Sequence, residues 1–272
     1  MFVFRMLSYI LFIFALARPQ STSRSEKHQT EGIDIILAMD ISGSMLAEDF
    51  HPNRIEAAKK VAMEFIDERE NDRMGLVVFS GESFTQCPLT TDHAVLKNLL
   101  KDIKSGMIED GTAIGMGLAT SVSRLKDSKA KSKVVILLTD GVNNRGFIDP
   151  LTGSGIAQSF GIRVYTIGVG TIGMAPYPMQ TPFGIQYQNM PVQIDEEVLQ
   201  KISDMTGGKY FRATDNKKLK AIYQEIDKLE KTKIDVLQYR RKSELFSTAA
   251  LIAGILFLLE LIFRYTIFRS NP

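Results

Sequence analysis

The chain has 272 residues, of which 44% are hydrophobic and 24% charged, and its formal net charge is +2. This composition excludes wholesale disorder, and without a basic excess there is no reason to expect nucleic acid as a partner. One cysteine, Cys87, excludes an internal disulfide and a multi-cysteine zinc site, and three histidines argue against a histidine-built one. At this length we expect one large domain or two small ones.

The first residues, 1–17, are nearly all apolar, with Arg5 as the only charge, and just reach the length of a membrane-spanning helix. A cleaved signal peptide is the alternative, because Ala15-Leu16-Ala17 has the small-x-small pattern of a cleavage site. Arg18-Pro19 directly after it makes cleavage awkward. We therefore expect an N-terminal membrane helix over 1–17, followed by a polar linker over 18–31.

In chain order, the segment 32–235 alternates between buried-strand runs and helical periods. The expected elements are strand 33–39, helix 53–69, strand 74–79, short strand 83–87, helix 92–104, helix 112–125, strand 133–139, helix 149–160, strand 162–169, helix 195–206, strand 209–212 and helix 217–231. This alternation predicts an α/β fold with a mostly parallel sheet covered by helices on both faces.

The segment 171–193 interrupts this rhythm with four prolines and is too long for an ordinary connection. We expect an excursion, such as a hairpin, at the ligand-binding end of the sheet. Its apolar and aromatic residues suit a partner interface, or alternatively pack on the domain's own flank. These residues are Met174, Tyr177, Met179, Phe183 and Tyr187.

A second apolar run, 245–263, contains one charge, Glu260. It is long enough to cross about 30 Å of hydrocarbon and lacks the polar face of a core helix, which predicts a C-terminal transmembrane helix. Basic residues near the two predicted membrane helices are more frequent on the middle segment, which favours a cytoplasmic domain. A signal peptide would place the domain on the opposite side, so the side of the membrane stays open.

Oxygen-bearing side chains gather where predicted strands end. Asp40, Ser42 and Ser44 follow the first strand at alternate positions, Thr112 opens a helix, and Asp140 follows strand 133–139. Ligands of open α/β sheets bind outside the carboxyl ends of the strands. Each residue alone has a simpler role as a helix cap or turn residue. Together, these hard oxygen donors predict a site for Mg²⁺ rather than for zinc.

This pattern resembles the metal-ion-dependent adhesion site (MIDAS) of von Willebrand factor A domains, over about residues 33–229. The resemblance implies a three-layer, Rossmann-like domain whose mostly parallel central sheet has one short antiparallel strand. It also implies that Mg²⁺, with Mn²⁺ as an alternative, is bound directly or through water, and that a partner protein supplies an Asp or Glu to the open metal position. The implied metal residues are Asp40, Ser42, Ser44, Thr112 and Asp140.

A narrower resemblance is to the bacterial Bat (aerotolerance) membrane proteins, and to their BatA members in particular. This resemblance rests on the order of the segments and on four short sequence motifs. They are Ala17-Arg18-Pro19-Gln20, Phe79-Ser80-Gly81-Glu82, Gln86-Cys87-Pro88-Leu89 and Gly207-Gly208-Lys209-Tyr210-Phe211-Arg212. The resemblance implies an integral protein of the bacterial inner membrane that acts in envelope stress tolerance. The implied partners are other Bat proteins and a MoxR-type AAA+ ATPase.

The residues beside the predicted metal loops also have expected roles. Glu48 and Asp49 either modulate the open metal position or lie on an ordinary exposed loop, whereas Asn143, Asn144 and Arg145 are expected to line the partner surface. Cys87 lacks a nearby base or helix N-terminus and is expected to be a buried structural cysteine.

The expected function is a membrane-anchored, Mg²⁺-dependent protein-binding module, a scaffold without catalysis of its own. One alternative is a Mg²⁺-dependent hydrolase with a strand-end aspartate as nucleophile. Neither a clearly placed acid or base nor a phosphate-binding loop or nucleophile elbow supports it. The other alternative is a structural membrane protein with an unused metal site.

Overall fold

The computed structural model describes residues 32–182 and 184–231 continuously. Near the ends it describes 6, 9, 13, 16, 20–22, 242–244, 251–252, 254–259 and 261–262. The chain divides into one unit of residues 30–234 and another of residues 1–29 and 235–272. In the latter, β1 (Gln20–Thr22) pairs antiparallel with β10 (Lys242–Glu244).

In the described parts of the chain, no helix has the length and apolar character needed to cross a membrane. The two predicted membrane segments, 1–17 and 245–263, are described only in part and stay predictions. Phe183 is likewise outside them.

A six-stranded sheet runs through the described residues 32–231 in the order β4-β3-β2-β5-β6-β9. Its strands are β2 (Asp34–Asp40), β3 (Arg73–Phe79), β4 (Ser83–Thr90), β5 (Lys133–Thr139), β6 (Arg163–Val169) and β9 (Tyr210–Ala213). All neighbours are parallel except β4, which pairs antiparallel with β3. The predicted mostly parallel α/β sheet is confirmed, and its antiparallel strand extends three residues beyond the predicted 83–87.

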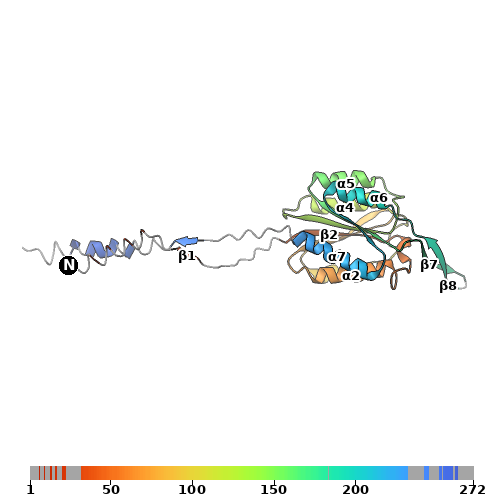
Figure 1. The fold of residues 1–272 in the computed structure, drawn as a ribbon, viewed down its shortest axis with the longest axis horizontal. Helices are drawn as coiled ribbons and strands as arrows, with labels where there is room; N and C mark the ends of the chain where they lie inside the picture. Colours follow the sequence, from red (N-terminus) through yellow and green to blue (C-terminus); the bar gives the residue numbers. More distant parts are fainter. Residues whose placement is uncertain are drawn as a thin grey trace, which may run out of the picture. The chain divides into compact units, whose positions relative to one another are not determined.

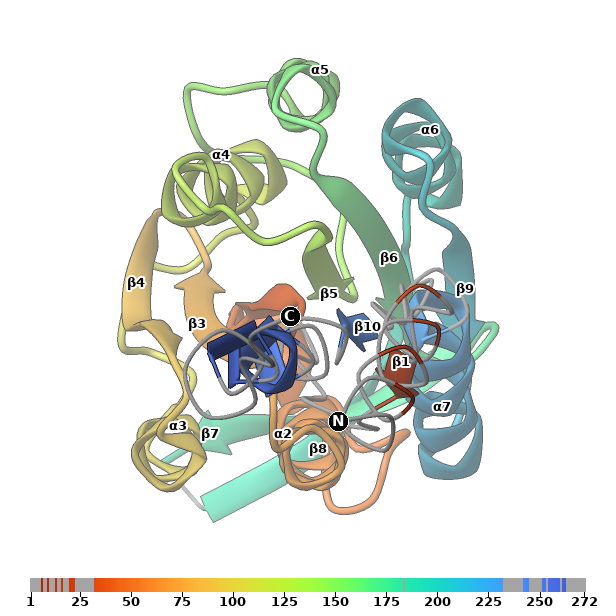
Figure 2. The same cartoon turned by 90° about the vertical axis from the view of Figure 1, so that its left-hand side faces the viewer.

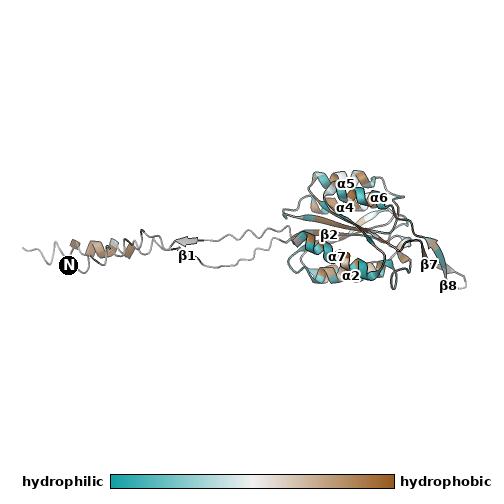
Figure 3. Cartoon of the chain, in the orientation of Figure 1, coloured by the Kyte–Doolittle hydropathy of each residue, from teal (hydrophilic) through white to brown (hydrophobic). Residues whose placement is uncertain are grey.

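Helices cover both faces of this sheet (Figure 2). One face carries α2 (Arg54–Asp67), α3 (His93–Lys101) and α7 (Asn216–Lys231), and the other carries α4 (Ile114–Leu125), α5 (Pro150–Ser159) and α6 (Glu196–Thr206). The central strand β2 has buried side chains on both faces, because alternate residues of a strand point to opposite sides. Ile35, Leu37 and Met39 contact the first helix layer, while Ile36 and Ala38 contact the second. The strands are accordingly coloured hydrophobic, and the helices are mixed (Figure 3).

Four helices begin at a capping side chain, which explains why their starts are predictable from sequence. Asn53, Asp92, Asp149 and Asp195 each accept a hydrogen bond from a backbone N–H of the first turn. Helix α6 ends at Gly207, which adopts the left-handed conformation with φ 70°. Glycine is favoured there because it has no Cβ to clash.

The chain enters and leaves this unit at the amino-terminal edge of the sheet. The entering segment leads into Asp34, the first residue of β2. At the end of α7, Glu230 accepts hydrogen bonds from Ser132, just before β5, and from Tyr165 in β6. The carboxyl ends of β2 and β5 therefore lie at the opposite edge.

The Pro-rich segment forms a two-stranded antiparallel hairpin, as predicted. Strands β7 (Met174–Thr181) and β8 (Gly184–Pro191) pair with Tyr177 opposite Gln188. The hairpin extends from this unit at the carboxyl edge of the sheet, away from the edge where the chain enters and leaves the unit (Figure 1).

Candidate metal site

The structure brings the five predicted metal residues to the carboxyl edge of the sheet. Asp40 is the last residue of β2, and Asp140 directly follows β5. Ser42 precedes the short 3₁₀ helix η1 (Gly43–Leu46), which contains Ser44, and Thr112 precedes α4. Strands β2 and β5 are parallel neighbours, with Met39 opposite Leu138, so both aspartates emerge side by side.

Hydrogen bonds join these residues into one cluster. The hydroxyl oxygens of Ser42 and Ser44 are 3.0 Å apart, and Ser44 Oγ donates to Asp140 Oδ1 at 2.7 Å. Asp40 accepts from the Ser42 N–H at 2.9 Å and from Thr139 Oγ1 at 2.6 Å. A Cβ placed on Gly141 would lie 3.0 Å from the Thr112 hydroxyl oxygen, so that hydroxyl borders Asp140.

The two aspartates are buried, and burial penalises their charged forms. Asp40 is 0% and Asp140 2% exposed. Burial, followed by the charge of Asp140, raises the pKa of Asp40 to about 7. Burial also raises the pKa of Asp140, despite its pairing with Arg54. A cation bound between them would stabilise both in the ionised form.

The donor set fits a hard divalent cation. It consists of two carboxylates and three hydroxyls, the type of ligand that Mg²⁺ and Mn²⁺ take in proteins. Among the residues that the structure describes, a search for three or more His, Cys, Asp or Glu side chains able to hold a metal finds no such group.

A buried arginine beside the site is the main feature that sequence reasoning missed. Arg54 is 3% exposed and donates to Asp140 Oδ2 at 2.6 Å. It also holds Asp49 through two hydrogen bonds, of 2.7 and 2.6 Å. Arg54 is the first residue of α2, where the helix dipole disfavours a cation. A positively charged side chain at this unfavourable helix position was the signal in the sequence that a carboxylate lies nearby.

Asp49 does not face an open metal position. Its carboxylate is taken up by Arg54 and by the Thr171 N–H, which donates to Oδ2 at 2.7 Å. Although burial acts against it, these bonds hold the pKa of Asp49 below its usual range. Asp49 thus connects Arg54 with the start of the hairpin segment.

The loop that carries Thr112 is held by two asparagines. Asn144 accepts from the Thr112 N–H at 2.8 Å, and Asn143 accepts from the Ile114 N–H at 2.9 Å. Their amide oxygens thus position the predicted metal loop, and the expectation that these residues line the partner surface stays a prediction. Arg145, exposed, pairs with Glu109 at 3.5 Å.

Gly43 lies where three parts of the chain approach closely. Its N–H donates to Asp110 Oδ1 at 2.8 Å. A Cβ at this position would lie 3.2 Å from Asp110 Oδ2 and 3.2 Å from the Tyr177 hydroxyl oxygen. A glycine between the two serines therefore lets Asp110 and the hairpin residue Tyr177 reach the metal loop.

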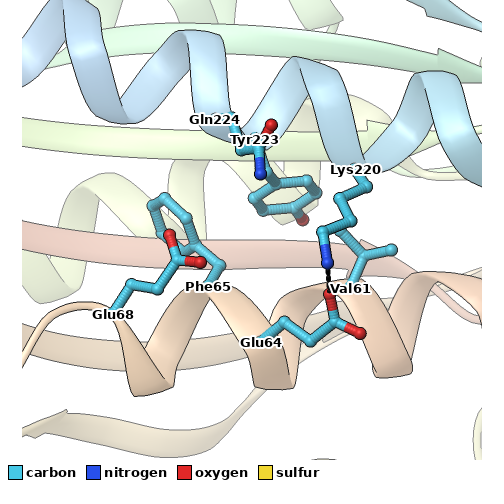
Figure 4. Close-up of a pocket in the computed structure, with 7 residues that line it drawn as sticks. All are labelled: Val61, Glu64, Phe65, Glu68, Lys220, Tyr223 and Gln224. Carbon is cyan, nitrogen blue, oxygen red and sulfur yellow. Dashed lines mark ion pairs between the residues drawn. The ribbon is translucent and has the colours of Figure 1, made fainter.

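Two other features do not belong to the site. Cys87 is 2% exposed, and burial raises the pKa of its thiol, which fits the predicted structural role. A shallow hollow between α2 and α7 is crossed by a Lys220–Glu64 ion pair of 2.7 Å (Figure 4). Phe65 and Tyr223 pack edge-on beside it, with ring centroids 5.1 Å apart, so it is a seam between packed helices.

The von Willebrand factor type A domain model matches residues 34–225. The chain belongs to this family. The A domain contains all five predicted metal residues within the matched range.

Similar proteins include an uncharacterized protein from Borreliella burgdorferi, 30% identical over 96% of this chain and 77% of its own length. A UPF0353 protein from Mycolicibacterium paratuberculosis is 28% identical over 79% of this chain and 65% of its own length. This chain therefore spans about two thirds to three quarters of the length of these relatives.

Two solved structures resemble the A domain. BatB from Bacteroides thetaiotaomicron is 34% identical with a TM-score of 0.65, over 74% of this chain and 100% of that one. An aerotolerance-related membrane protein from Bacteroides fragilis is 33% identical with a TM-score of 0.62, over 72% and 100%. Both agree with the resemblance to Bat proteins noted in the sequence.

A third solved structure carries a metal at the corresponding motif. Proximal thread matrix protein 1 from the mussel byssus, with a zinc-occupied MIDAS motif, is 25% identical with a TM-score of 0.57, over 73% of this chain and 46% of that one. In that protein, the motif holds a divalent metal.

Proposed function

We propose that this chain is a membrane-anchored, divalent-cation-dependent protein-binding module. The observation that carries the proposal is the pair of buried carboxylates, Asp40 and Asp140, surrounded by three hydroxyls at the carboxyl edge of the sheet. Mg²⁺, with Mn²⁺ as an alternative, is the ion that these ligands suit. The proposed metal residues are Asp40, Ser42, Ser44, Thr112 and Asp140.

When bound, the metal supplies a site for an anionic oxygen from outside the chain. The A domain's own residues orient that site. Ser44 holds Asp140 by a hydrogen bond, Thr139 holds Asp40, and Gly43 keeps the loop closed against Asp110. A carboxylate of a partner protein is the ligand we propose, because a protein supplies it on a flexible side chain.

The side chains around the aspartates support binding rather than catalysis. Arg54, which contacts Asp140, keeps its proton throughout the physiological range and is therefore no acid or base. His51, the histidine nearest to the metal loop in sequence, is exposed, and its backbone is bonded at both N–H and C=O by Asn216.

The relatives suggest the setting of this module. Solved neighbours are BatB and an aerotolerance-related membrane protein. We propose that the chain is a BatA-like scaffold of the bacterial inner membrane, anchored through 1–17 and 245–263. Other Bat proteins and a MoxR-type AAA+ ATPase are the partners we propose for it, in an envelope stress or aerotolerance complex.

The test is co-purification of the full chain from membranes, followed by mass spectrometry. The native chain, Asp40→Ala and a control, Asp102→Ala, are each compared in Mg²⁺ and in EDTA. Asp102 is an exposed aspartate at the end of α3, outside the site. We expect a protein retained by the native and control chains in Mg²⁺ and lost with EDTA or Asp40→Ala. Identical protein lists in all samples would overturn the proposal.

A further inference from the structure

The hairpin segment 171–193 contains no charged residue, and most of its described residues are exposed. Charged residues make 24% of the chain, and every residue of β8 is exposed. Large apolar side chains are solvent-accessible along it, and Ile185 and Tyr187 are 62% and 60% exposed. The exposed large apolar residues of this segment are Ile172, Met174, Met179, Ile185, Tyr187 and Met190. The strand register places Met179 and Met190 on the face of the hairpin that carries Tyr177, and Ile185 and Tyr187 on the opposite face, where the Tyr187 hydroxyl donates to Glu48 Oε1 at 3.2 Å. Exposed apolar side chains on an uncharged hairpin are typical of an interaction site.

The hairpin is fastened to the metal site at its start. The Thr171 N–H donates to Asp49, Asp49 pairs with Arg54, and Arg54 pairs with Asp140. Farther along, the Pro176 carbonyl accepts from the Glu48 N–H at 2.8 Å. These contacts hold the hairpin in a fixed position beside the metal loops.

Through Tyr177, the hairpin reaches the predicted metal loop. Its hydroxyl and the Asp110 carboxylate both border Gly43, the residue between the two serine ligands. The phenolic O–H of Tyr177 is a hydrogen-bond donor. A carboxylate that arrives at the metal therefore meets this hydroxyl on the hairpin side.

We propose that the β7–β8 hairpin is the second half of the partner-binding face. Its occupant is a segment of a partner protein that carries one carboxylate flanked by uncharged, largely apolar side chains. The carboxylate binds the metal and accepts a hydrogen bond from Tyr177, while the apolar side chains lie on Met179 and Met190, which the strand register places on the same face as Tyr177. This inference rests on the proposed function, since it requires the metal to receive a partner's carboxylate.

A protein segment fits this surface better than a membrane does. The hairpin has no Lys or Arg to attract anionic lipid headgroups. It also lies at the carboxyl edge of the sheet, whereas the chain enters and leaves the unit at the amino-terminal edge. Among the described strands β8 pairs only with β7, so its outer edge offers backbone groups to an extended peptide.

The test uses a phage-displayed random peptide library and the full chain in detergent micelles. Peptides are selected in Mg²⁺, eluted with EDTA, and their Kd values are measured against four proteins. These are the native chain, the double variant Met179→Ser/Met190→Ser, Tyr177→Phe, and the control Phe160→Ser. Phe160 is an exposed aromatic residue, 43% accessible, whose carbonyl accepts from Lys133 at the start of β5, far from the hairpin.

We expect the eluted peptides to share one Asp or Glu flanked by apolar residues. Their Kd should rise about 30-fold in the double variant, which removes two apolar contact surfaces, and about 10-fold in Tyr177→Phe, which removes a hydrogen bond to a charged group. Phe160→Ser should leave it unchanged. Acidic, Mg²⁺-dependent peptides that bind all four proteins equally would overturn the inference and leave the proposed function standing.

Other results are equally decisive. Failure to select any Mg²⁺-dependent acidic peptide would contradict the proposed function itself, and the inference with it. The same variants are tested for binding to neutral and anionic lipid vesicles and for self-association by sedimentation. If the double variant abolishes vesicle binding or self-association but leaves peptide binding intact, the occupant is a membrane or a second copy, and the inference is wrong.

Discussion

We expect Asp40 to lower the stability of the metal-free protein and to provide affinity for the metal. It is fully buried next to Asp140, and its raised pKa shows that the metal-free protein disfavours its charge. Asp40→Asn removes that charge and keeps the shape of the side chain. We expect Mg²⁺ affinity to fall about 100-fold or more, while the free energy of unfolding in EDTA at pH 8 rises by about 1–3 kcal/mol. Isothermal titration calorimetry and chemical denaturation measure the two effects.

The matched control is Asp102→Asn, at an exposed position, which should change neither quantity. A variant Asp40→Asn that binds Mg²⁺ like the native chain would remove Asp40 from the metal site. A loss of stability in EDTA would show that the Asp40 charge is compensated in a way the contacts do not reveal.

Arg54 has the opposite role, because it compensates buried charge. Arg54→Met leaves Asp49 and Asp140 without their shared cation, and removing one partner of a buried ion pair costs about 3–5 kcal/mol. We expect the melting temperature to fall sharply in EDTA and to be restored more strongly by Mg²⁺ than in the native chain. Differential scanning calorimetry with and without Mg²⁺ tests this, and equal Mg²⁺-induced shifts in both proteins would contradict it.

At the scale of elements, Glu230 attaches the end of α7 to the sheet. It accepts hydrogen bonds from Tyr165, Arg163 and Ser132. Although burial acts to raise it, these bonds hold the pKa of Glu230 below its ordinary value. A lowered pKa stabilises the fold at pH values above the unfolded-state pKa, and that contribution is lost as the pH falls through the folded-state pKa.

We therefore expect Glu230→Gln to lower the free energy of unfolding by about 1–3 kcal/mol at pH 7, with the difference shrinking in acid. Denaturation curves between pH 3 and pH 7 measure it. The control is Glu225→Gln on the same helix, whose exposed carboxylate pairs with Lys209 and should contribute little. A Glu230→Gln difference that persists undiminished at the lowest pH would show that it arises from packing.

The helices and strands are largely predictable from the sequence. Strand β5 has the predicted bounds, 133–139, because a fully buried parallel strand is a continuous apolar run between charged and glycine-containing neighbours. Helix starts are within one or two residues, because capping side chains stand at them. Strand β4 is longer than predicted, since Pro88 to Thr90 carry no strand pattern and are extended through pairing with β3.

The candidate site is predictable in part for the same reason. Residues that directly follow buried strands, such as Asp40 and Asp140, must emerge at one edge of a parallel sheet. The contacts of Arg54 with Asp140 and of Tyr177 with the Gly43 region join segments 86 and 134 residues apart. No local pattern specifies such a pairing, because it depends on how the α2 layer and the hairpin pack at that edge.

At the scale of the whole molecule, the candidate binding site and the two ends of the A domain lie at opposite edges of the sheet. The metal residues and the hairpin lie at the carboxyl edge of the sheet, and the chain leaves the unit at the other edge, where Glu230 fastens α7. A partner held at the metal would thus lie at the edge of the A domain opposite to the edge where the chain enters and leaves this unit. This arrangement suits a scaffold that holds one protein while it is itself anchored.

The pH dependence of the full chain should differ between its metal-free and metal-bound forms. In EDTA, the folded state keeps a proton on Asp40 up to about pH 7, whereas the unfolded chain releases it near pH 4. The folded state then binds more protons in this window, so its stability falls as the pH rises. With about 1.4 kcal/mol for each pH unit, the loss between pH 4 and pH 7 reaches up to about 4 kcal/mol.

Saturating Mg²⁺ should offset this loss, because the metal binds the ionised carboxylates and its affinity rises as Asp40 deprotonates. The Mg²⁺-induced increase in melting temperature is therefore expected to grow between pH 5 and pH 7.5 and then to level off. Thermal unfolding across this range, with Mg²⁺ and with EDTA, measures it. In Asp40→Asn the EDTA curve should be flatter, because the main titrating group is gone. A Mg²⁺ effect that is independent of pH would mean that the metal does not bind at these aspartates.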